Sequence, residues 1–317
     1  MKIGYVGSGS IMQYHILASG IAGFQPTAIC ARQNSKTALD LSLKYKNLMY
    51  CADILTFLEK DFDAITIAVS VESCIDVLKQ CMEKNIPILV EKPVSLNSLS
   101  LDIFDSKDTS KIIVGYNRRH YSSVSAFKSK LSKMQGGLVQ VSIPELSWDK
   151  DSSSELRQNM LYENVVHVLD LANYLFGSIE ITNKVKTSDL KGLAYSSSNF
   201  ITPGGFVGSI SLGFGTPENI SIKVWGNGQC IELNPLEEFR ESGSIQMIPA
   251  TSENPVKKYV KTFSSDWKIN KDDLVTKPGF LGQYKELYKM ANKIKFDSKS
   301  ANLKDARVAL NLAKMIS

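Results

Sequence analysis

The chain opens with a strand, a glycine turn and a helix, and this opening constrains its fold more than any other stretch. Lys2–Val6 is a short β-prone run, Gly7–Gly9 interrupts it, and a helix-forming run follows from Ser10 to Ala18. This order is typical of dinucleotide-binding folds, in which glycines permit a tight turn and let the backbone approach a pyrophosphate. The N–H groups that begin the helix would face that anion. The predicted phosphate contacts are Gly7, Gly9, Ser10 and Ile11.

Strands and helices are predicted to alternate through the first 119 residues. Further strands are expected at 27–31, 48–50, 63–69, 87–91 and 111–115, with helices at 35–45, 54–58 and 72–84 between them. The run at 63–69 is mostly apolar, as expected inside a parallel sheet. We therefore predict a doubly wound α/β Rossmann domain over residues 1–119. Ligands of such sheets lie at the carboxyl ends of the strands, which adds four expected cofactor contacts: Val69, Glu91, Lys92 and Asn117.

The second strand ends at Ala31-Arg32, where NAD-binding proteins usually carry an acidic residue for the ribose 2′-hydroxyl. Without that carboxylate nothing repels a 2′-phosphate, and the guanidinium of Arg32 can pair with one. We predict NADP as the cofactor, with NAD as the alternative. The competing interpretation is a solvated arginine in a loop that enters a helix.

The second half of the chain has a different pattern. Alternating runs near 139–143, 180–186, 193–200, 209–212, 220–224 and 230–233 predict a large, mainly antiparallel sheet. Helices are expected at 121–134, 280–293 and 303–316, and residues 241–278 show no clear period and are predicted to be mostly loop. We predict an α+β domain over residues 120–317.

A predicted helix at 161–176 is apolar around most of its circumference, which indicates burial. It nevertheless carries a narrow polar stripe of Glu163, His167, Asp170 and Tyr174. Buried ionisable groups are costly unless they are paired, so the stripe predicts either a structural polar network or a functional site. A glutamate, a histidine and an aspartate without further histidine or cysteine ligands make a poor transition-metal set, so no metal site is predicted.

Composition excludes several classes of protein. The 317 residues carry a formal charge of +5 without a block of like charge, which argues against a nucleic-acid partner. No apolar run is long enough to span a membrane. Five cysteines without a Cys-x-x-Cys pair are typical of reduced thiols. Because the sequence begins directly with a predicted strand, a cytoplasmic location is expected.

Four motifs in order resemble the glucose–fructose oxidoreductase/inositol dehydrogenase/MocA (Gfo/Idh/MocA) family. They are Gly7-Ser8-Gly9 followed by His15, then Glu91-Lys92-Pro93, then the run from Gly115 to Tyr121, and lastly Glu163-x-x-x-His167-x-x-Asp170. The chain departs from the family in having Val71-Glu72 and Cys74 after the fourth strand. It also has Glu163 where the family usually has aspartate.

The resemblance implies catalytic roles for Lys92 and His167. A histidine titrates near neutrality, so His167 suits a general base or acid. Lys92 would hydrogen-bond the same substrate oxygen and stabilise its negative charge. Glu163 would orient His167 or bind a substrate hydroxyl. The expected substrate contacts are Arg118, Tyr121, Asn164 and Arg157, the last toward an anionic group such as a nucleotide-sugar diphosphate.

The predicted activity is that of an NAD(P)-dependent oxidoreductase acting on a ring carbon of a sugar, cyclitol or nucleotide sugar. The resemblance also implies a homo-oligomer, because the family uses the open face of the second sheet as a subunit interface. Two alternatives stay open: a non-catalytic dinucleotide-binding regulator, and an NAD-assisted glycoside hydrolase on the same scaffold.

Overall fold

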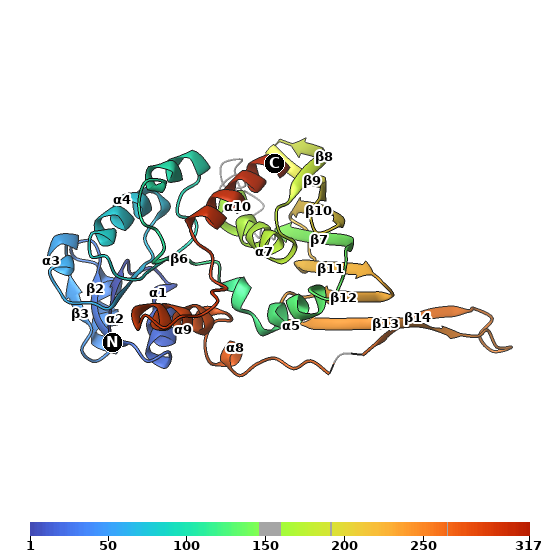
Figure 1. Ribbon diagram of the computed structural model, residues 1–317, viewed down its shortest axis with the longest axis horizontal. Helices are drawn as coiled ribbons and strands as arrows, with labels where there is room; N and C mark the ends of the chain where they lie inside the picture. Colours follow the sequence, from blue (N-terminus) through green and yellow to red (C-terminus); the bar gives the residue numbers. More distant parts are fainter. Residues whose placement is uncertain (146–159, 191, 265) are drawn as a thin grey trace. The chain divides into compact units, whose positions relative to one another are not determined.

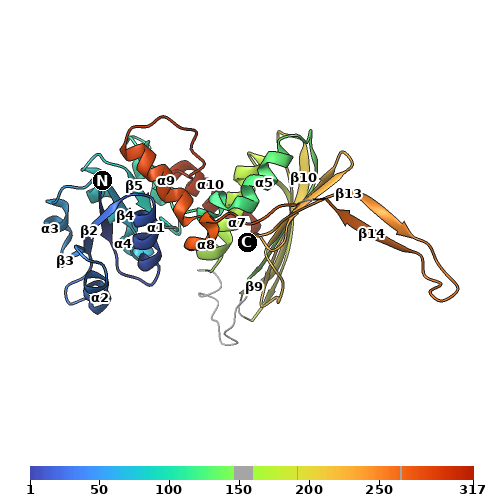
Figure 2. The same ribbon diagram turned by 90° about the horizontal axis from the view of Figure 1, so that it is seen from below.

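The structure, a computed structural model, describes residues 1–145, 160–190, 192–264 and 266–317 (Figures 1 and 2). These residues form two compact units. The first comprises Met1–Tyr121 and Asn270–Leu312, and the second comprises Ser122–Ile269 and Ala313–Ser317.

The first unit is built on a parallel six-stranded sheet with the order β3-β2-β1-β4-β5-β6. Its central strands are short apolar runs buried along their length, as expected where helices cover both faces of a sheet. The predicted Rossmann architecture is confirmed. The strands are β1 (Lys2–Val6), β2 (Gln25–Cys30), β3 (Met49–Cys51), β4 (Ala64–Ile67), β5 (Ile88–Val90) and β6 (Ile112–Val114).

Helices connect these strands in sequence. Ser35 and Asp53 cap α2 and α3 by accepting hydrogen bonds from Ala38 N and Thr56 N, respectively. No side chain caps the start of α1. The helical segments are α1 (Met12–Ile21), α2 (Lys36–Lys44), α3 (Ile54–Leu58), α4 (Val71–Met82) and the 3-10 helices η1 (Ser98–Phe104) and η2 (Asn117–His120).

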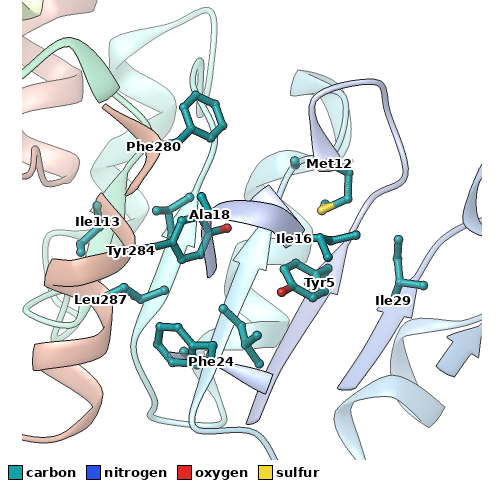
Figure 3. Close-up of a cluster of buried hydrophobic side chains, with 14 of the residues drawn as sticks. Tyr5, Met12, Ile16, Ala18, Phe24, Ile29, Ile113, Phe280, Tyr284 and Leu287 are labelled. Carbon is teal, nitrogen blue, oxygen red and sulfur yellow. The ribbon is translucent and has the colours of Figure 1, made fainter. Parts of the chain in front are cut away.

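The segment Asn270–Leu312 returns to the first unit, whereas the sequence placed all of 120–317 in one second domain. It contains α8 (Asp272–Val275), α9 (Phe280–Ala291) and most of α10 (Leu303–Ile316). The reason is hydrophobic: α9 packs on α1 and contributes Phe280, Tyr284 and Leu287 to the buried cluster of Figure 3. The other border follows Tyr121, two residues beyond the predicted one.

The second unit contains an eight-stranded sheet with the order β14-β13-β12-β11-β7-β10-β9-β8. Only β7 and β10 pair in parallel; the other pairs in the described part of this sheet are antiparallel, which confirms the mainly antiparallel prediction. The strands are β7 (Gly137–Glu145), β8 (Glu180–Asp189), β9 (Gly192–Ile201), β10 (Phe206–Phe214), β11 (Ser221–Gly226), β12 (Gln229–Leu233), β13 (Phe239–Ile248) and β14 (Lys258–Phe263).

The last two strands correct the prediction of a loop over 241–278. Figures 1 and 2 show β13 and β14 extending as a hairpin beyond the rest of this sheet. Most of their side chains are exposed on both faces, so neither strand has the apolar–polar alternation from which strands are predicted.

One face of the second sheet is covered by helices, with α5 (Ser122–Leu131) and α7 (Val166–Phe176) on the same side in Figure 2. The predicted helix over 161–176 begins differently from expectation, because Leu161–Val165 forms a π-helical turn (η3) before α7. Single π-helical turns are rare and are frequently found at functional sites. In the part of the chain that the structure describes, no helix has the length and apolar character needed to span a membrane.

Candidate functional site

A cavity of about 670 Å³ lies at the carboxyl ends of β1 to β4 in the first unit. This volume is in the range of small-molecule sites, and the position is where parallel α/β sheets bind ligands. Four of the predicted cofactor residues lie together in its lining: Gly7, Gly9, Arg32 and Val69.

Glycine stands at positions 7 and 9 of the opening motif for two different structural reasons. Gly7 has φ of +107°, and a Cβ there would lie 2.0 Å from the carbonyl oxygen of Ala68, so only glycine fits. Gly9 has no atom within 4 Å of the position that a Cβ would take. The fold thus requires Gly7, whereas Gly9 leaves open space beside the uncapped start of α1, as the approach of a phosphate requires.

The other two predicted phosphate contacts lie directly at this turn. Ser10 is exposed, and Ile11 is the half-buried N-cap residue of α1. The residue after them, Met12, replaces the third small residue of the fingerprint and is completely buried in the core of the first unit (Figure 3).

Beyond β2, a group of hydroxyls accompanies the exposed Arg32. Ser8 Oγ lies 3.0 Å from Ser35 Oγ and 2.9 Å from Thr37 Oγ1. Tyr50 donates to the carbonyl oxygen of Arg32 at 2.7 Å, which fixes the backbone of this loop. The guanidinium and the hydroxyls together can bind an anion.

Asp53 is the one acidic residue among the described residues that line the cavity. It caps α3, and the hydrogen bond from the Thr56 N–H lowers the pKa of its carboxyl. An ionised carboxylate in this cavity acts against the binding of a 2′-phosphate and can accept a hydrogen bond from a ribose hydroxyl.

Glu91 and the half-buried Lys92 follow β5, and the Lys92–Pro93 peptide bond is cis. Glu91 Oε1 lies 3.0 Å from His15 Nε2, and Glu91 Oε2 accepts a hydrogen bond from the Lys92 N–H at 3.1 Å. Burial raises the pKa of Glu91, but the interaction with His15 and the charge of Lys92 outweigh it and leave the pKa below its ordinary value. The carboxylate beside Lys92 is therefore ionised near neutral pH.

Some residues after β6 have side chains engaged within the fold, and one has a donor that the fold does not use. Asn117 is 7 % exposed and donates to the carbonyl oxygen of Pro278 at 2.8 Å, so its amide is engaged within the fold. Arg118 Nη1 is buried and has no hydrogen-bond partner among the described residues. Tyr121 is buried beside Gly279. Arg118 is thus the member of this group with an unused donor.

In the second unit the π-helical turn changes the predicted polar stripe. Glu163 and Asn164 are exposed on the turn, His167 is half-buried at the start of α7, and Asp170 is 1 % exposed. Asn164 donates to Glu145 Oε2 at 3.2 Å. The residues from Glu163 to Asp170 thus lie within about two turns of one helical segment. Arg157 lies outside the described residues.

Tyr174, the last residue of the stripe, is engaged differently. Lys128 Nζ lies 3.3 Å from the centre of its ring and donates to its carbonyl oxygen at 3.4 Å. This cation–π contact joins α5 to α7, so Tyr174 has a structural role within the second unit.

Sequence reasoning missed several polar residues of these sites. Ser8, Ser35 and Thr37 were overlooked because each hydroxyl alone is an ordinary loop residue. Glu145 is 7 % exposed at the carboxyl end of β7, and an acid at that end of an apolar alternating strand is a signal that could have identified it.

Comparison with known proteins agrees with this fold. Residues 1–106 match the family model GFO_IDH_MocA, described as an oxidoreductase family with an NAD-binding Rossmann fold. No curated protein sequence matches the chain.

Among solved structures, a dehydrogenase (MviM) from Clostridium difficile has a TM-score of 0.76 at 18 % identity, covering 99 % of this chain and 98 % of that one. UDP-N-acetylglucosamine 3-dehydrogenase GnnA from Acidithiobacillus ferrooxidans has a TM-score of 0.74 at 12 % identity, covering 100 % and 96 %. A levoglucosan dehydrogenase in complex with NADH and levoglucosan has a TM-score of 0.75 at 15 % identity, again covering 100 % and 96 %. At these identities the likeness establishes the fold. Residues 1–106 thus match the model of an oxidoreductase family with an NAD-binding Rossmann fold, and the fold of the described residues agrees with the resemblance seen in the sequence.

Proposed function

We propose that this chain is an NAD(P)-dependent oxidoreductase that transfers hydride between nicotinamide and a ring carbon of a sugar, cyclitol or nucleotide sugar. The observation that carries the proposal is the cavity at the carboxyl end of the first sheet, where Gly9 leaves open space at the uncapped start of α1. A dinucleotide pyrophosphate fits that combination of space and backbone N–H donors. In this role Ser10, Ile11 and Val69 contact the cofactor beside the two glycines.

NADP is the proposed cofactor, because Arg32 and the hydroxyls of Ser8, Ser35 and Thr37 form a group suited to a 2′-phosphate. NAD is the second candidate, and Asp53 in the same cavity favours it.

When bound, the nicotinamide supplies the acceptor or donor of hydride; the residues of the chain supply the proton chemistry. For alcohol oxidation, the C–H hydride leaves the ring carbon, the hydroxyl proton passes to the His167 imidazole, and a C=O bond forms. Lys92 hydrogen-bonds the same oxygen while negative charge develops on it. Glu163 orients His167 or binds a second hydroxyl, and Glu91 and Asn117 support the cofactor crevice.

A sugar-like substrate is supported by two structural neighbours, whose names state that they act on UDP-N-acetylglucosamine and on levoglucosan. Within this chain, Arg118 Nη1 is a buried donor without a hydrogen-bond partner among the described residues. The exposed Asn164 side chain is held by its hydrogen bond to the Glu145 carboxylate. We assign substrate contacts to Arg118, Tyr121, Asn164 and Arg157.

A cytoplasmic homo-oligomer is the proposed setting of this activity. All five cysteines are free thiols, as is usual in a reducing compartment. The face of the second sheet away from α5 and α7 exposes large apolar side chains, among them Leu138, Tyr195 and Val207, and such a face suits a subunit interface.

The first experiment is a calorimetric titration of the full chain with NADPH and NADH, using Gly9→Ala as the test variant and Gly20→Ala as its control. Neither added Cβ would have an atom within 4 Å, so both variants should fold. We expect Gly9→Ala to weaken dinucleotide binding at least tenfold, because the Cβ takes the space of the phosphate. Equal affinities of Gly9→Ala and Gly20→Ala would contradict the proposed phosphate site.

The second experiment measures absorbance at the nicotinamide band against a panel of sugars, cyclitols and nucleotide sugars. Turnover on a panel member establishes the class. Tight binding without turnover contradicts the proposed redox activity and favours a regulator or, if the bound cofactor shows no net redox change while a glycoside is cleaved, a hydrolase.

A further inference from the structure

A line of close polar contacts runs through the first unit and ends at the carboxylate beside Lys92. Thr66 Oγ1 on β4 lies 2.8 Å from the Tyr284 hydroxyl on α9, and that hydroxyl lies 3.0 Å from His15 Nδ1 on α1. The other ring nitrogen of His15, Nε2, lies 3.0 Å from Glu91 Oε1. Residues of β4, α9 and α1 thus form one line of contacts that ends at the carboxylate after β5.

The line is shielded from solvent. Thr66, His15 and Tyr284 are completely buried, and the Glu91 side chain is 15 % exposed. Because buried polar groups without partners are costly, the position of each group fixes that of the next. The imidazole is further held by the ring of Phe280, whose centroid lies 4.8 Å away.

The Glu91 carboxylate is held on its remaining sides as well. The Lys92 N–H donates to Oε2 at 3.1 Å. A Cβ on Gly115, the residue after β6, would lie 2.9 Å from both Cδ and Oε2 of Glu91. The carboxylate therefore fills a space that exists only because residue 115 is glycine.

We propose that His15 and Tyr284 are positioning residues for Lys92: through the buried contacts from Thr66 to Glu91 they fix the carboxylate that holds the Lys92 peptide and faces its charge. The inference rests on the proposed function, since it assigns Lys92 to the chemistry. It also extends the site beyond the family match at residues 1–106, because Tyr284 belongs to α9.

The direction of donation follows from hydrogen-bond inventory. A carboxylate only accepts, so the 3.0 Å contact with Glu91 assigns a proton to His15 Nε2, although the contact lacks the alignment of a hydrogen bond. In neutral histidine Nδ1 then accepts from the Tyr284 O–H, and Tyr284 accepts from Thr66. The groups near Glu91 that could titrate are His15, Lys92, Cys74 and Tyr284. Burial raises the pKa of Cys74 to about 12 and that of Tyr284 well above its ordinary value, so both stay neutral in the working range.

The structure offers a matched pair of tyrosines for the test (Figure 3). Tyr284 and Tyr5 are both completely buried in the same hydrophobic cluster, and each hydroxyl has a hydrogen-bond partner. The Tyr5 hydroxyl contacts Ser19 Oγ at 2.6 Å and, among the interactions of the described residues, makes no hydrogen bond with His15 or Glu91. Tyr284→Phe and Tyr5→Phe thus remove similar groups from the same core, and only the first removal reaches Glu91.

The primary readout is independent of activity: ¹⁵N NMR of the imidazole of His15, which can be assigned because the chain has three histidines. We expect Tyr284→Phe to change the His15 Nδ1 shift, because that nitrogen loses its contact with the Tyr284 hydroxyl, and Tyr5→Phe to leave the shift as in wild type. An unchanged His15 spectrum in Tyr284→Phe would overturn the proposal, whatever the activity of the protein.

The second readout is the pH profile of kcat on a panel substrate with NADPH. Tyr284→Phe should lower kcat about tenfold, as for the loss of one hydrogen bond, while KM for NADPH stays within about twofold. The acid limb should move to higher pH, because a less well solvated Glu91 carboxylate binds a proton more readily. Gly115→Ala, which displaces the same carboxylate from the opposite side, should produce the same limb shift. A profile identical to that of Tyr5→Phe would overturn the positioning role, whereas absence of turnover in the wild type would refute the proposed function and leave the NMR result to decide the inference.

Discussion

The first unit holds two histidines that contact α9, the completely buried His15 and the half-buried His120, and their contacts support different parts of the structure. His15 contacts Tyr284 of α9 and Glu91 at the end of β5. His120 packs against Gly282 of α9, interacts with the charge of Glu286 and lies 3.0 Å, through Nε2, from Ser300 Oγ. One group of contacts leads to Lys92, and the other ends in the chain segment that precedes α10.

The second group has the character of a structural junction. Glu286 accepts hydrogen bonds from Ser298 Oγ and from the N–H groups of Lys299 and Ser300, which ties that loop to α9. The comparison teaches that burial and pairing alone do not identify a functional histidine; what its partners hold in place does. Changes near His15 should therefore appear in turnover, and changes near His120 should appear in stability.

The largest expected effect is on turnover at the His15 end. Lys92→Ala should lower kcat roughly 10²- to 10³-fold, because a donor to the reacting oxygen is lost. Dinucleotide affinity and the urea unfolding midpoint should stay close to wild type. The control is Lys79→Ala, which removes an exposed lysine whose partner is Asp76. A fully active Lys92→Ala enzyme would remove Lys92 from the mechanism.

The next effect is on stability at the His120 end. Burial lowers the pKa of His120 from 6.5 to about 4, with Lys299 and Arg119 adding to the shift and Glu286 and Asp273 opposing it. Since the unfolded chain binds this proton more readily, stability is full above pH 6.5 and is lost as the pH falls toward 4. Between pH 7 and pH 5 the loss should be about 2 kcal/mol. Urea unfolding of wild type and His120→Asn at both pH values measures it, and an equal pH dependence in the two proteins would refute the assignment.

The same comparison separates what the sequence could predict from what it could not. The six strands of the first sheet were predicted because buried parallel strands are uninterrupted apolar runs, and Gly7 because a positive φ restricts the choice of residue. The contacts of His15 were not predicted, because Tyr284 lies 269 positions away and looks like any apolar-face residue of α9.

Within the second unit the limits have other physical causes. The π-helical turn at Leu161–Val165 depends on backbone bonding that helical periodicity does not encode, so the spacing of Glu163 and His167 did not predict it. The hairpin of β13 and β14 escaped prediction because both of its faces are exposed. The roles of Lys92, His167 and Glu163 stay predictions.

A pair of glycine variants tests whether the contacts of His120 with α9 contribute to stability. A Cβ on Gly282 would lie 2.7 Å from His120 Cβ, whereas a Cβ on Gly20 of α1 would meet no atom within 4 Å. Gly282→Ala should therefore lower the free energy of unfolding by about 1 to 2 kcal/mol through overpacking. Gly20→Ala should raise it by up to about 1 kcal/mol, because alanine favours a helix. Urea unfolding measures both changes. A stabilised Gly282→Ala would contradict the overpacking prediction, because it would show that His120 can move away from the added Cβ at little cost.

The smallest expected effect concerns Arg32 and Asp53, which line the cavity of the first unit and, in the described part of the chain, contact neither His15 nor His120. If Arg32 binds a 2′-phosphate, Arg32→Ala should weaken NADPH about tenfold, or roughly 1.4 kcal/mol, and NADH less than twofold. Asp53→Asn should do the opposite, strengthening NADPH by removing a carboxylate from the same cavity. Both variants should leave the His15 imidazole spectrum and the acid stability unchanged, since no contact connects Arg32 to either histidine among the interactions of the described residues. Equal losses of NADPH and NADH in Arg32→Ala would assign the arginine to the adenosine that both cofactors share, and the preference for NADP would then have to come from the hydroxyls of Ser8, Ser35 and Thr37.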